Sequence, residues 1–226
     1  MIAKTPQDFL PFSQRKIISW KDMSWTIPEF SREQVNVAGA RLISGGVSES
    51  EMEQSLKIVN NWRSSHSCLL QTTKMLLLGR AQKIDGIPLV AQRIKRIQTI
   101  KEKLIKQTDM KLSQMQDIGG CRAILKDVSL VEKLLFIYEK ARAKNPNNRV
   151  EFSGMKNYIL EPKIDGYRGI HLVYKYRTIS PKLQVFSGLK IEIQLRSKLQ
   201  HAWATAVEAM SDITKQSLSA VVPHLS

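Results

Sequence analysis

The chain has 226 residues, of which 42% are hydrophobic and 24% are charged. This length and balance predict a folded globular protein large enough to bury its own core, and they exclude general disorder. Lys and Arg number 35 against 20 Asp and Glu, giving a net charge of +15 at pH 7. That excess favours polyanionic partners such as nucleotides, nucleic acid or an acidic membrane face, without choosing among them.

The cysteines and the hydropathy pattern exclude further classes. Cys68 and Cys121 lie far apart in the chain, with no CxxC and no histidine partner at zinc spacing, so neither a disulfide scaffold nor a zinc ribbon is expected. No apolar run approaches the ~20 residues of a membrane-spanning helix. Residues 1–20 also lack the apolar stretch of a secretory signal. We therefore expect a cytoplasmic protein that does not bind a membrane.

Two regions are expected along the chain. Residues 1–45 form a peripheral N-terminal segment, because prolines interrupt any long helix there and a Ser-Gly-Gly turn follows. Residues 46–226 form a single domain that begins with helices. Serines and glutamates at the start of residues 48–82 suit helix capping, so one or two helices are predicted over that range.

A further helix is predicted over residues 88–106. Apolar residues recur there at helical spacing, and proline is tolerated in the first turn of a helix. The apolar stripe consists of Val90, Ile94, Ile97, Ile100 and Leu104. The opposite side would carry Gln92, Lys95, Arg96, Thr99, Lys103 and Lys106. Such a basic face can bind several phosphates, although a solvated charged face is the more common explanation.

The remainder of the chain predicts strands alternating with helices. We expect strands at 121–127, 169–177 and 189–195, helices at 128–144 and 197–215, and a loop at 145–148. No internal repeat is present. Helices alternating with at least three strands indicate an α/β or α+β fold, with a mixed β-sheet flanked by helices.

The last predicted strand carries a regular alternation. Apolar residues occupy the odd-numbered positions of residues 189–196, and Lys190, Glu192, Gln194 and Arg196 occupy the even-numbered ones. Alternate residues of a strand point to opposite faces, so one face would join the core and the other would be polar. By itself the pattern also fits an ordinary half-buried strand.

Two glycine-containing motifs precede predicted strands. The motif QDIGGCR, residues 116–122, places Asp117 beside two glycines, where backbone can approach a ligand closely. The motif EPKIDGYRGIH, residues 161–171, brackets Tyr167 with glycines among basic side chains, which suits base stacking with phosphate contacts. Each motif alone also fits a simple turn.

The order of these motifs resembles that of a known family. The pattern R-x-K-x-x-x-T-x-x-x-K, at Arg93, Lys95, Thr99 and Lys103, precedes DIGGCR, PKIDGYRGIH and EIQLRSKLQHAWATAVE. This series is similar to the synthetase domain of the RelA/SpoT family of alarmone synthetases, and the likeness spans about residues 60–210.

The resemblance implies a fold and a reaction. Family members have a fold similar to polymerase-β nucleotidyltransferases and transfer the β,γ-diphosphate of ATP to the 3′-hydroxyl of GDP or GTP, making (p)ppGpp and releasing AMP. The partners implied are therefore ATP and GDP or GTP. The cofactor implied is Mg²⁺, which prefers the hard oxygen ligands that carboxylates supply.

The resemblance also implies residue roles. The ATP-binding residues implied are Arg93, Lys95, Thr99 and Lys103. Asp117 and Glu192 would hold Mg²⁺, and Glu192 would also deprotonate the attacking hydroxyl. The acceptor purine would stack on Tyr167. The other acceptor-binding residues implied are Lys163, His171, Gln194 and Arg196.

Two positions depart from the family pattern. Asp165 stands where members more often have Asn or Ser, and Gly169 stands where many have Ser, which puts acceptor recognition in question. No His-Asp pair with metal-ligand spacing lies upstream, so the hydrolase domain of long members is not expected. The sequence fits a stand-alone small synthetase as well as part of a longer chain.

Two other functions stay open. Some short members of the family are toxins that pyrophosphorylate the 3′ end of tRNA, and the large positive charge would suit an RNA acceptor. That branch would bring tRNA and an antitoxin as partners. The third possibility is an inactive RNA-binding module, although such a module would have little reason to keep both Asp117 and Glu192.

Overall fold

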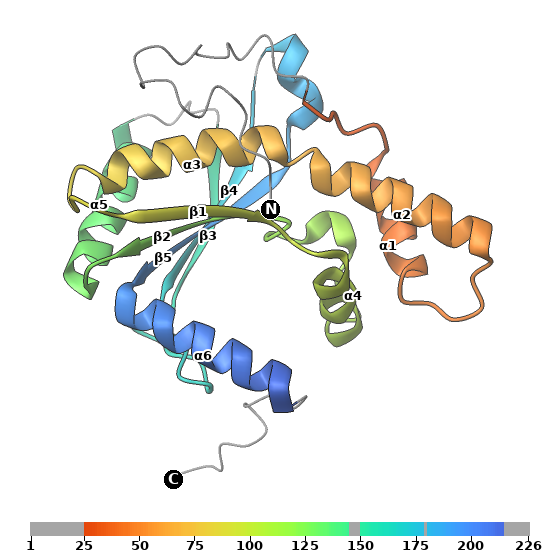
Figure 1. Cartoon of the computed structure of the whole chain (residues 1–226). Coiled ribbons are helices and arrows are strands. Elements are labelled where there is room, and N and C mark those ends of the chain that lie inside the picture. The colour runs from red at the N-terminus through yellow and green to blue at the C-terminus, as the bar shows by residue number, and fades with distance from the viewer. Residues whose placement is uncertain (1–24, 145–149, 179, 215–226) are drawn as a thin grey trace, which may run out of the picture.

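Five strands form one mixed sheet with helices on both faces (Figure 1). The structure is a computed structural model that describes residues 25–144, 150–178 and 180–214. The strands are β1 Leu89–Ile94, β2 Gly119–Leu125, β3 Val150–Asn157, β4 Ile170–Tyr176 and β5 Lys190–Ser197. Their order is β1-β2-β5-β4-β3, with β2 and β5 parallel and the other neighbours antiparallel. The predicted fold class, a mixed sheet flanked by helices, is confirmed.

Helices lie on both faces of the sheet and beyond one end of it (Figure 1). They are α1 Arg32–Arg41, α2 Glu49–Ser64, α3 Ser67–Ala81, α4 Ile97–Lys106, α5 Val128–Lys144 and α6 Lys198–Thr214, with short 3-10 helices at Leu112–Gln114 and Pro181–Phe186. The helices α3 and α5 enclose the apolar core on one face, while α6 and α4 lie below the sheet in Figure 1. None of the helices in these described ranges is long and apolar enough to cross a membrane.

The helices predicted over residues 48–82 are α2 and α3, which meet at His66. Ser48 begins α2 with a capping box, because its hydroxyl accepts the Glu51 N–H and the Glu51 carboxylate accepts the Ser48 N–H. In the N-terminal segment, α1 packs against α2 and contributes to the core. Residues 1–24 of that segment and the loop predicted at 145–148 lie outside the described residues.

The helix predicted over residues 88–106 is wrong in its first half. That half is the strand β1, paired with β2, and α4 begins only at Ile97. Val90 and Ile94 misled the prediction, because residues four positions apart share a face in a strand as well as in a helix. The polar residues assigned to one helical face therefore come from three places: Gln92 from a strand, Lys95 and Arg96 from a short link, and the others from a helix.

The remaining predicted elements match the structure. The helices at 128–144 and 197–215 are α5 and α6, and the strands at 121–127, 169–177 and 189–195 are β2, β4 and β5. The strand β3 was not predicted. A register shift between Phe152 and Gly154 interrupts its alternation, so the period-2 signal that identifies a strand is lost.

Gly119, at the start of β2, lies where α3 and β5 approach each other. A Cβ atom there would lie 2.7 Å from Cδ1 of Ile191 and 3.3 Å from Cβ of His66. We expect Gly119→Ala to lower the free energy of unfolding, measured in urea, by about 1–3 kcal/mol, because these side chains have to shift. Gly120→Ala is the matched control, since its added Cβ meets only the Glu192 carbonyl oxygen, at 3.9 Å. Equal losses in the two variants would contradict this explanation.

Candidate active site

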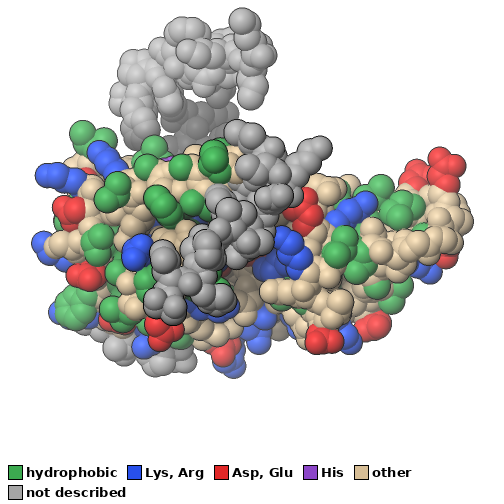
Figure 2. Space-filling view, turned by 90° about the horizontal axis from the view of Figure 1, so that it is seen from below, with side chains coloured by type: hydrophobic (Ala, Val, Ile, Leu, Met, Phe, Trp, Pro, Cys, Tyr) green, Lys and Arg blue, Asp and Glu red, His purple; other side chains and the backbone are tan. Residues whose placement is uncertain are grey.

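The predicted site residues gather on the face of the sheet that α4 and α6 flank. Strand pairing sets Gly120 between Arg93 and Glu192, and sets His171 opposite Gln194. Residues paired across a sheet point to the same face, so all these side chains project together. Figure 2 views the molecule from below and shows Lys and Arg side chains near the centre of this face.

The alternation predicted for residues 189–196 is confirmed. Ile191, Ile193 and Leu195 are buried in the core, which turns the polar members of β5 toward the other face. Two of those polar side chains, Gln194 and Arg196, are themselves buried. Buried polar groups require partners. Gln194 bonds to Arg122 on β2, and Arg196 bonds to Gln194 on its own strand and to Tyr167 in the turn before β4.

Asp117 lies just before β2 and binds two lysines. Nζ of Lys95 lies 2.8 Å from one carboxylate oxygen, and Nζ of Lys103 lies 2.8 Å from the other. Burial would raise the pKa of Asp117, but the two ammonium groups outweigh it and hold the pKa below its usual value. Lys95 comes from the link between β1 and α4, and Lys103 comes from α4. The turn between these elements thus brings together the residues that a single helix was predicted to align.

Arg63, near the end of α2, supports this cluster. Its Nε donates a hydrogen bond of 2.8 Å to the backbone carbonyl of Lys95. The Lys95 side chain is only 7% exposed, and a buried ammonium is stable only when paired. The contact from α2 therefore helps to fix the lysine against Asp117.

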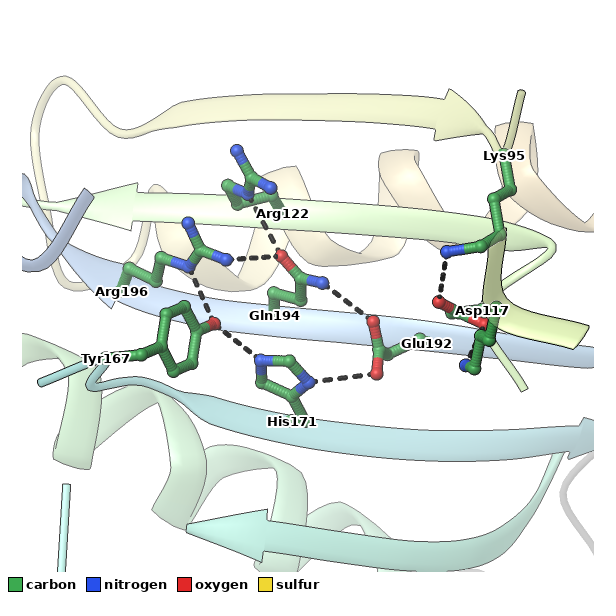
Figure 3. A network of polar contacts seen from close by, with 9 residues as sticks. Lys95, Asp117, Arg122, Tyr167, His171, Glu192, Gln194 and Arg196 are labelled. Atoms are coloured by element: carbon green, nitrogen blue, oxygen red, sulfur yellow. Dashed lines mark hydrogen bonds and ion pairs between the residues drawn. The ribbon is translucent and has the colours of Figure 1, made fainter. Parts of the chain in front are cut away.

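Glu192, on β5, is the second carboxylate, and both of its oxygens are held (Figure 3). Nδ1 of His171 donates to Oε1 at 2.9 Å, and Nε2 of Gln194 donates to Oε2 at 2.7 Å. The Gln194 amide cannot turn over, because its oxygen accepts from Arg122 at 3.1 Å and from Arg196 at 3.0 Å. Two arginines therefore orient the amide that orients the carboxylate.

The Tyr167 hydroxyl extends this network. It lies 2.6 Å from Nε2 of His171 and accepts a hydrogen bond of 3.0 Å from Nε of Arg196. Nε2 of His171 faces the tyrosine while its Nδ1 donates to Glu192, so one imidazole links the two side chains. The contacts thus run from Arg196 through Tyr167 and His171 to Glu192.

The Tyr167 ring lies beside two cations at a tight turn. Nζ of Lys163 is 4.8 Å from the ring centroid, and Cζ of Arg196 is 4.7 Å from it. Gly166 precedes the tyrosine with a φ of 74°, which favours glycine. The carboxylate of Asp165 accepts the Tyr167 N–H at 3.0 Å. An asparagine oxygen makes the same turn, so the departure at Asp165 preserves this local structure.

Gly169, the other departure from the family pattern, is closely surrounded. A Cβ atom there would lie 3.2 Å from Cγ of Arg196 and 3.3 Å from the Tyr167 hydroxyl. A serine at this position would require both side chains to shift. The absence of a side chain here therefore permits the observed contact between the arginine and the tyrosine.

The structure brings Asp117 and Glu192 into one region. Burial would raise the pKa of Glu192, but the hydrogen bonds from His171 and Gln194 lower it on balance, while the negative charge of Asp117 opposes that lowering. Figure 3 shows the two carboxylates on the same polar face, where the pairing of β2 with β5 sets Gly120, three residues after Asp117, beside Glu192. The two carboxylates that the resemblance assigns to one metal ion therefore lie on one face of the sheet.

The carboxylate pair offers the type of ligand preferred by Mg²⁺, the cofactor that the resemblance implies. Two anionic groups that repel each other are stabilised by a divalent cation, and carboxylate oxygens are the ligands that Mg²⁺ prefers. Among the described residues, no group of three or more His, Cys, Asp or Glu side chains could hold a metal. Mg²⁺ commonly takes only one or two protein carboxylates and completes its shell with water and substrate phosphates, so two carboxylates are sufficient.

Three predicted residues have side chains outside the hydrogen-bonded network of the described residues. Lys163 contacts the Tyr167 ring instead. Thr99 is half-buried on α4, and Arg93 is exposed on β1. Arg93 is nevertheless close enough to influence Arg122. Burial lowers the pKa of Arg122, and the positive charges of Arg196 and Arg93 lower it further. Arg93 therefore belongs to the same face without touching the carboxylates.

Sequence reasoning missed two members of the site. Arg122 was quoted within DIGGCR but given no role, and its contact with Gln194 depends on the pairing of β2 with β5. Tyr158 packs edge-on against both Tyr167 and His171, at centroid distances of 5.6 and 5.1 Å. The even spacing from Gly120 to Arg122 was an available signal, since it places both residues on one face of a strand.

Solved structures share this fold. Small alarmone synthetase 2 from Bacillus subtilis matches with a TM-score of 0.57 and 20% identity, over 71% of this chain and 86% of that chain. Small alarmone synthetase 1 from Bacillus subtilis, bound to its product pppGpp, matches with a TM-score of 0.55 and 24% identity, over 69% of this chain and 78% of that chain. The fold is therefore the one found in small alarmone synthetases.

Sequence comparison gives the family. Residues 92–215 match the model for the "Region found in RelA / SpoT proteins". Because this match covers more than half of the chain, the chain belongs to the RelA/SpoT family, as the motifs predicted.

Two relatives give the extent of the likeness. The GTP pyrophosphokinase YjbM of Bacillus subtilis (strain 168) is 31% identical over 135 residues, which are 55% of this chain and 56% of that protein. A probable chloroplastic GTP diphosphokinase of Oryza sativa subsp. japonica is 26% identical over 204 residues, which are 89% of this chain and 24% of that protein. The matches thus span about half of the first relative and a quarter of the second.

Proposed function

We propose that the chain is an ATP-dependent pyrophosphokinase that transfers the β,γ-diphosphate of ATP to the 3′-hydroxyl of GDP or GTP. The products are ppGpp or pppGpp and AMP. The observation that carries this proposal is the placement of Asp117 and Glu192 on one face lined by lysines, arginines and an aromatic ring (Figure 3). The names of the relatives, a GTP pyrophosphokinase and a probable GTP diphosphokinase, support it.

The Asp117 end of the site suits the donor nucleotide. Lys95 and Lys103 converge there, and Arg93 projects from the neighbouring strand β1 on the same face. These cations would bind the triphosphate, whose dense negative charge has to be offset. Asp117 and Glu192 would hold Mg²⁺, whose positive charge would stabilise the diphosphate as its bond to AMP weakens.

Glu192 suits the role of proton acceptor. The 3′-oxygen of the acceptor bonds to the β-phosphorus, the bond from that phosphorus to the AMP oxygen breaks, and AMP leaves with the electron pair. The proton of the attacking hydroxyl passes to Glu192. Because the pKa of Glu192 lies below its usual value, the carboxylate is ionised at neutral pH. A weak base suffices in a loose phosphoryl-transfer transition state, since the hydroxyl loses its proton late.

The Tyr167 end of the site suits the acceptor nucleotide. Its ring would stack on the purine, and Lys163 beside the ring would contact phosphate or ribose oxygens. A direct acceptor contact was expected of His171, whereas Gln194 was expected to orient either Glu192 or the acceptor. Both side chains already hold Glu192. We therefore assign them as positioning residues, with Arg196 and Arg122 orienting them in turn.

Replacing Tyr167 tests the stacking role. We expect Tyr167→Ala to raise the KM for GDP or GTP roughly 5- to 150-fold, because stacking of a base on an aromatic ring contributes about 1–3 kcal/mol. The KM for ATP should stay within about twofold. Tyr167→Phe is the matched control, since it keeps the ring and removes only the hydroxyl. Steady-state kinetics with each substrate varied in turn would contradict the assignment if both KM values rose together.

The reaction itself is tested by following the terminal label of ATP. The chain is incubated with γ-labelled ATP and Mg²⁺, and GDP, GTP, ATP or deacylated tRNA is offered separately. Label on GDP or GTP, abolished by EDTA, is the expected result. Absence of label on every acceptor would support the inactive RNA-binding module instead.

A second candidate function is pyrophosphorylation of the 3′ end of tRNA. The observation that favours it is the net charge of +15, which exceeds what two nucleotides require and would attract an RNA backbone. Asp117 and Glu192 would have the same roles in this reaction, because a ribose hydroxyl again attacks the β-phosphorus of ATP. Label on deacylated tRNA and not on GDP or GTP would select this candidate, and an antitoxin would then be an expected partner.

A further inference from the structure

The strand β3 forms one edge of the sheet, and the described residues leave its outer side unpaired. It runs for eight residues, Val150–Asn157, so it presents a row of backbone N–H and C=O groups. Free edges of this length pair readily with another strand unless the protein prevents it. The side chains of β3 therefore determine which strand can pair with this edge.

A bulge in β3 alters which side chains share a face. The pairing with β4 shifts between Phe152 and Gly154. Before the shift, Glu151 pairs with Lys175 on the polar face, and after it Lys156 pairs with His171 on the same face. In a regular strand, residues separated by an odd number of positions would point to opposite faces. The bulge is what places Glu151 and Lys156 together.

The two charged residues lack partners of their own. Glu151 and Lys156 are exposed, and neither forms an ion pair within the ranges that the structure describes. Their charges are opposite, and they are placed nearly symmetrically about the centre of β3. If a second β3 runs antiparallel to the first with Glu151 opposite Lys156, the reciprocal pair forms at the same time.

The opposite face of β3 is apolar and incompletely covered. Phe152 packs edge-on against Tyr174 at 5.8 Å, and Met155 is 44% exposed. A cavity of about 200 Å³ separates α5 from β3 and β4, lined in part by Leu135, Phe152, Met155 and Tyr174. In the same antiparallel arrangement, Phe152 lies opposite Met155 of the second copy, so each copy covers the exposed apolar side chain of the other.

We infer that two copies of this chain associate through β3, antiparallel and about a two-fold axis, to form one continuous ten-stranded sheet. The register sets Glu151 opposite Lys156 and Phe152 opposite Met155. Shifting the register by two residues would place Glu151 opposite Gly154 or Tyr158 and lose both ion pairs. A bulge and charged side chains protect the edge of a sheet against pairing in arbitrary registers. In β3 they leave one register favourable, the one in which both ion pairs form.

The test is a charge swap in the full chain, with the dimer measured by sedimentation velocity over a range of protein concentrations. Wild type should dimerise reversibly. E151K and K156E should each weaken the dimer at least about tenfold, because symmetry converts two attractive pairs into two repulsive ones. The double variant E151K/K156E should restore the dimer, since the charges are exchanged but remain opposite.

Matched controls separate this contact from a general effect of charge. E132K changes the net charge by the same amount as E151K, and K198E by the same amount as K156E. Both lie at exposed positions, on α5 and α6, and should leave the dimer unchanged. Circular dichroism confirms that each variant is folded. The inference is overturned if the wild type stays monomeric. It is also overturned if E151K and K156E both dimerise as strongly as the wild type, or if the double variant E151K/K156E does not dimerise. Catalytic activity is not a readout, so failure of the proposed function leaves this test intact.

Discussion

Glu192→Gln should abolish diphosphate transfer while leaving the protein folded. The amide cannot accept the proton of the attacking hydroxyl, and general-base catalysis alone contributes about 10²- to 10⁴-fold. The loss of one anionic ligand for Mg²⁺ adds to this. We expect kcat to fall by at least about 10³-fold, measured as label transferred from γ-labelled ATP to GDP or GTP.

The network around Glu192 predicts that the structural cost of this change is small. The oxygen of the new side chain can still accept from His171, whereas its amino group faces the fixed amino group of Gln194. One hydrogen bond is lost, which costs about 1 kcal/mol. Glu132→Gln, at an exposed carboxylate on α5, is the matched control and should keep wild-type activity. Near-normal turnover in Glu192→Gln, with folding verified, would remove Glu192 from the mechanism.

The strand carrying Glu192 shows how far local pattern predicts a site. Alternation along β5 correctly placed the apolar side chains in the core and the polar ones on the other face. It could not show that Arg122 holds the Gln194 amide, because that contact depends on β2 and β5 being neighbours. Partners across a sheet are separated by long stretches of chain, and nothing in the spacing of either segment specifies them.

The opposite lesson comes from the lysines. Lys95 and Lys103 were expected to converge because both would lie on one helix, and that helix does not exist over its first half. They converge nonetheless, since the link after β1 turns Lys95 toward Asp117 while α4 presents Lys103. The motif resemblance assigned Lys95 and Lys103 to one site, and the structure places them on one carboxylate. Hydrophobic spacing misassigned the backbone, because Val90 and Ile94 fit the period of a strand as well as that of a helix.

The buried histidine at the start of α3 predicts a stability that depends on pH. His66 is 1% exposed, and its Nδ1 lies 2.8 Å from the Trp62 carbonyl oxygen. Burial lowers its pKa to about 4, and the hydrogen bond to the carbonyl offsets this only in part. The imidazole therefore stays neutral in the folded protein at pH values where the unfolded chain, with a pKa near 6.5, already binds a proton.

This difference means that the free energy of unfolding should fall as the pH is lowered from about 6.5 to about 4, because the unfolded state binds more protons throughout that window. At 1.36 kcal/mol per pKa unit, the loss is about 3 kcal/mol. Urea unfolding at a series of pH values measures it. His66→Asn should have a lower stability at neutral pH but a shallower slope below pH 6.5. His201→Asn is the comparison: His201 is only half-buried, so its removal should flatten the slope less. An unchanged slope in His66→Asn would show that the histidine is not the group that titrates.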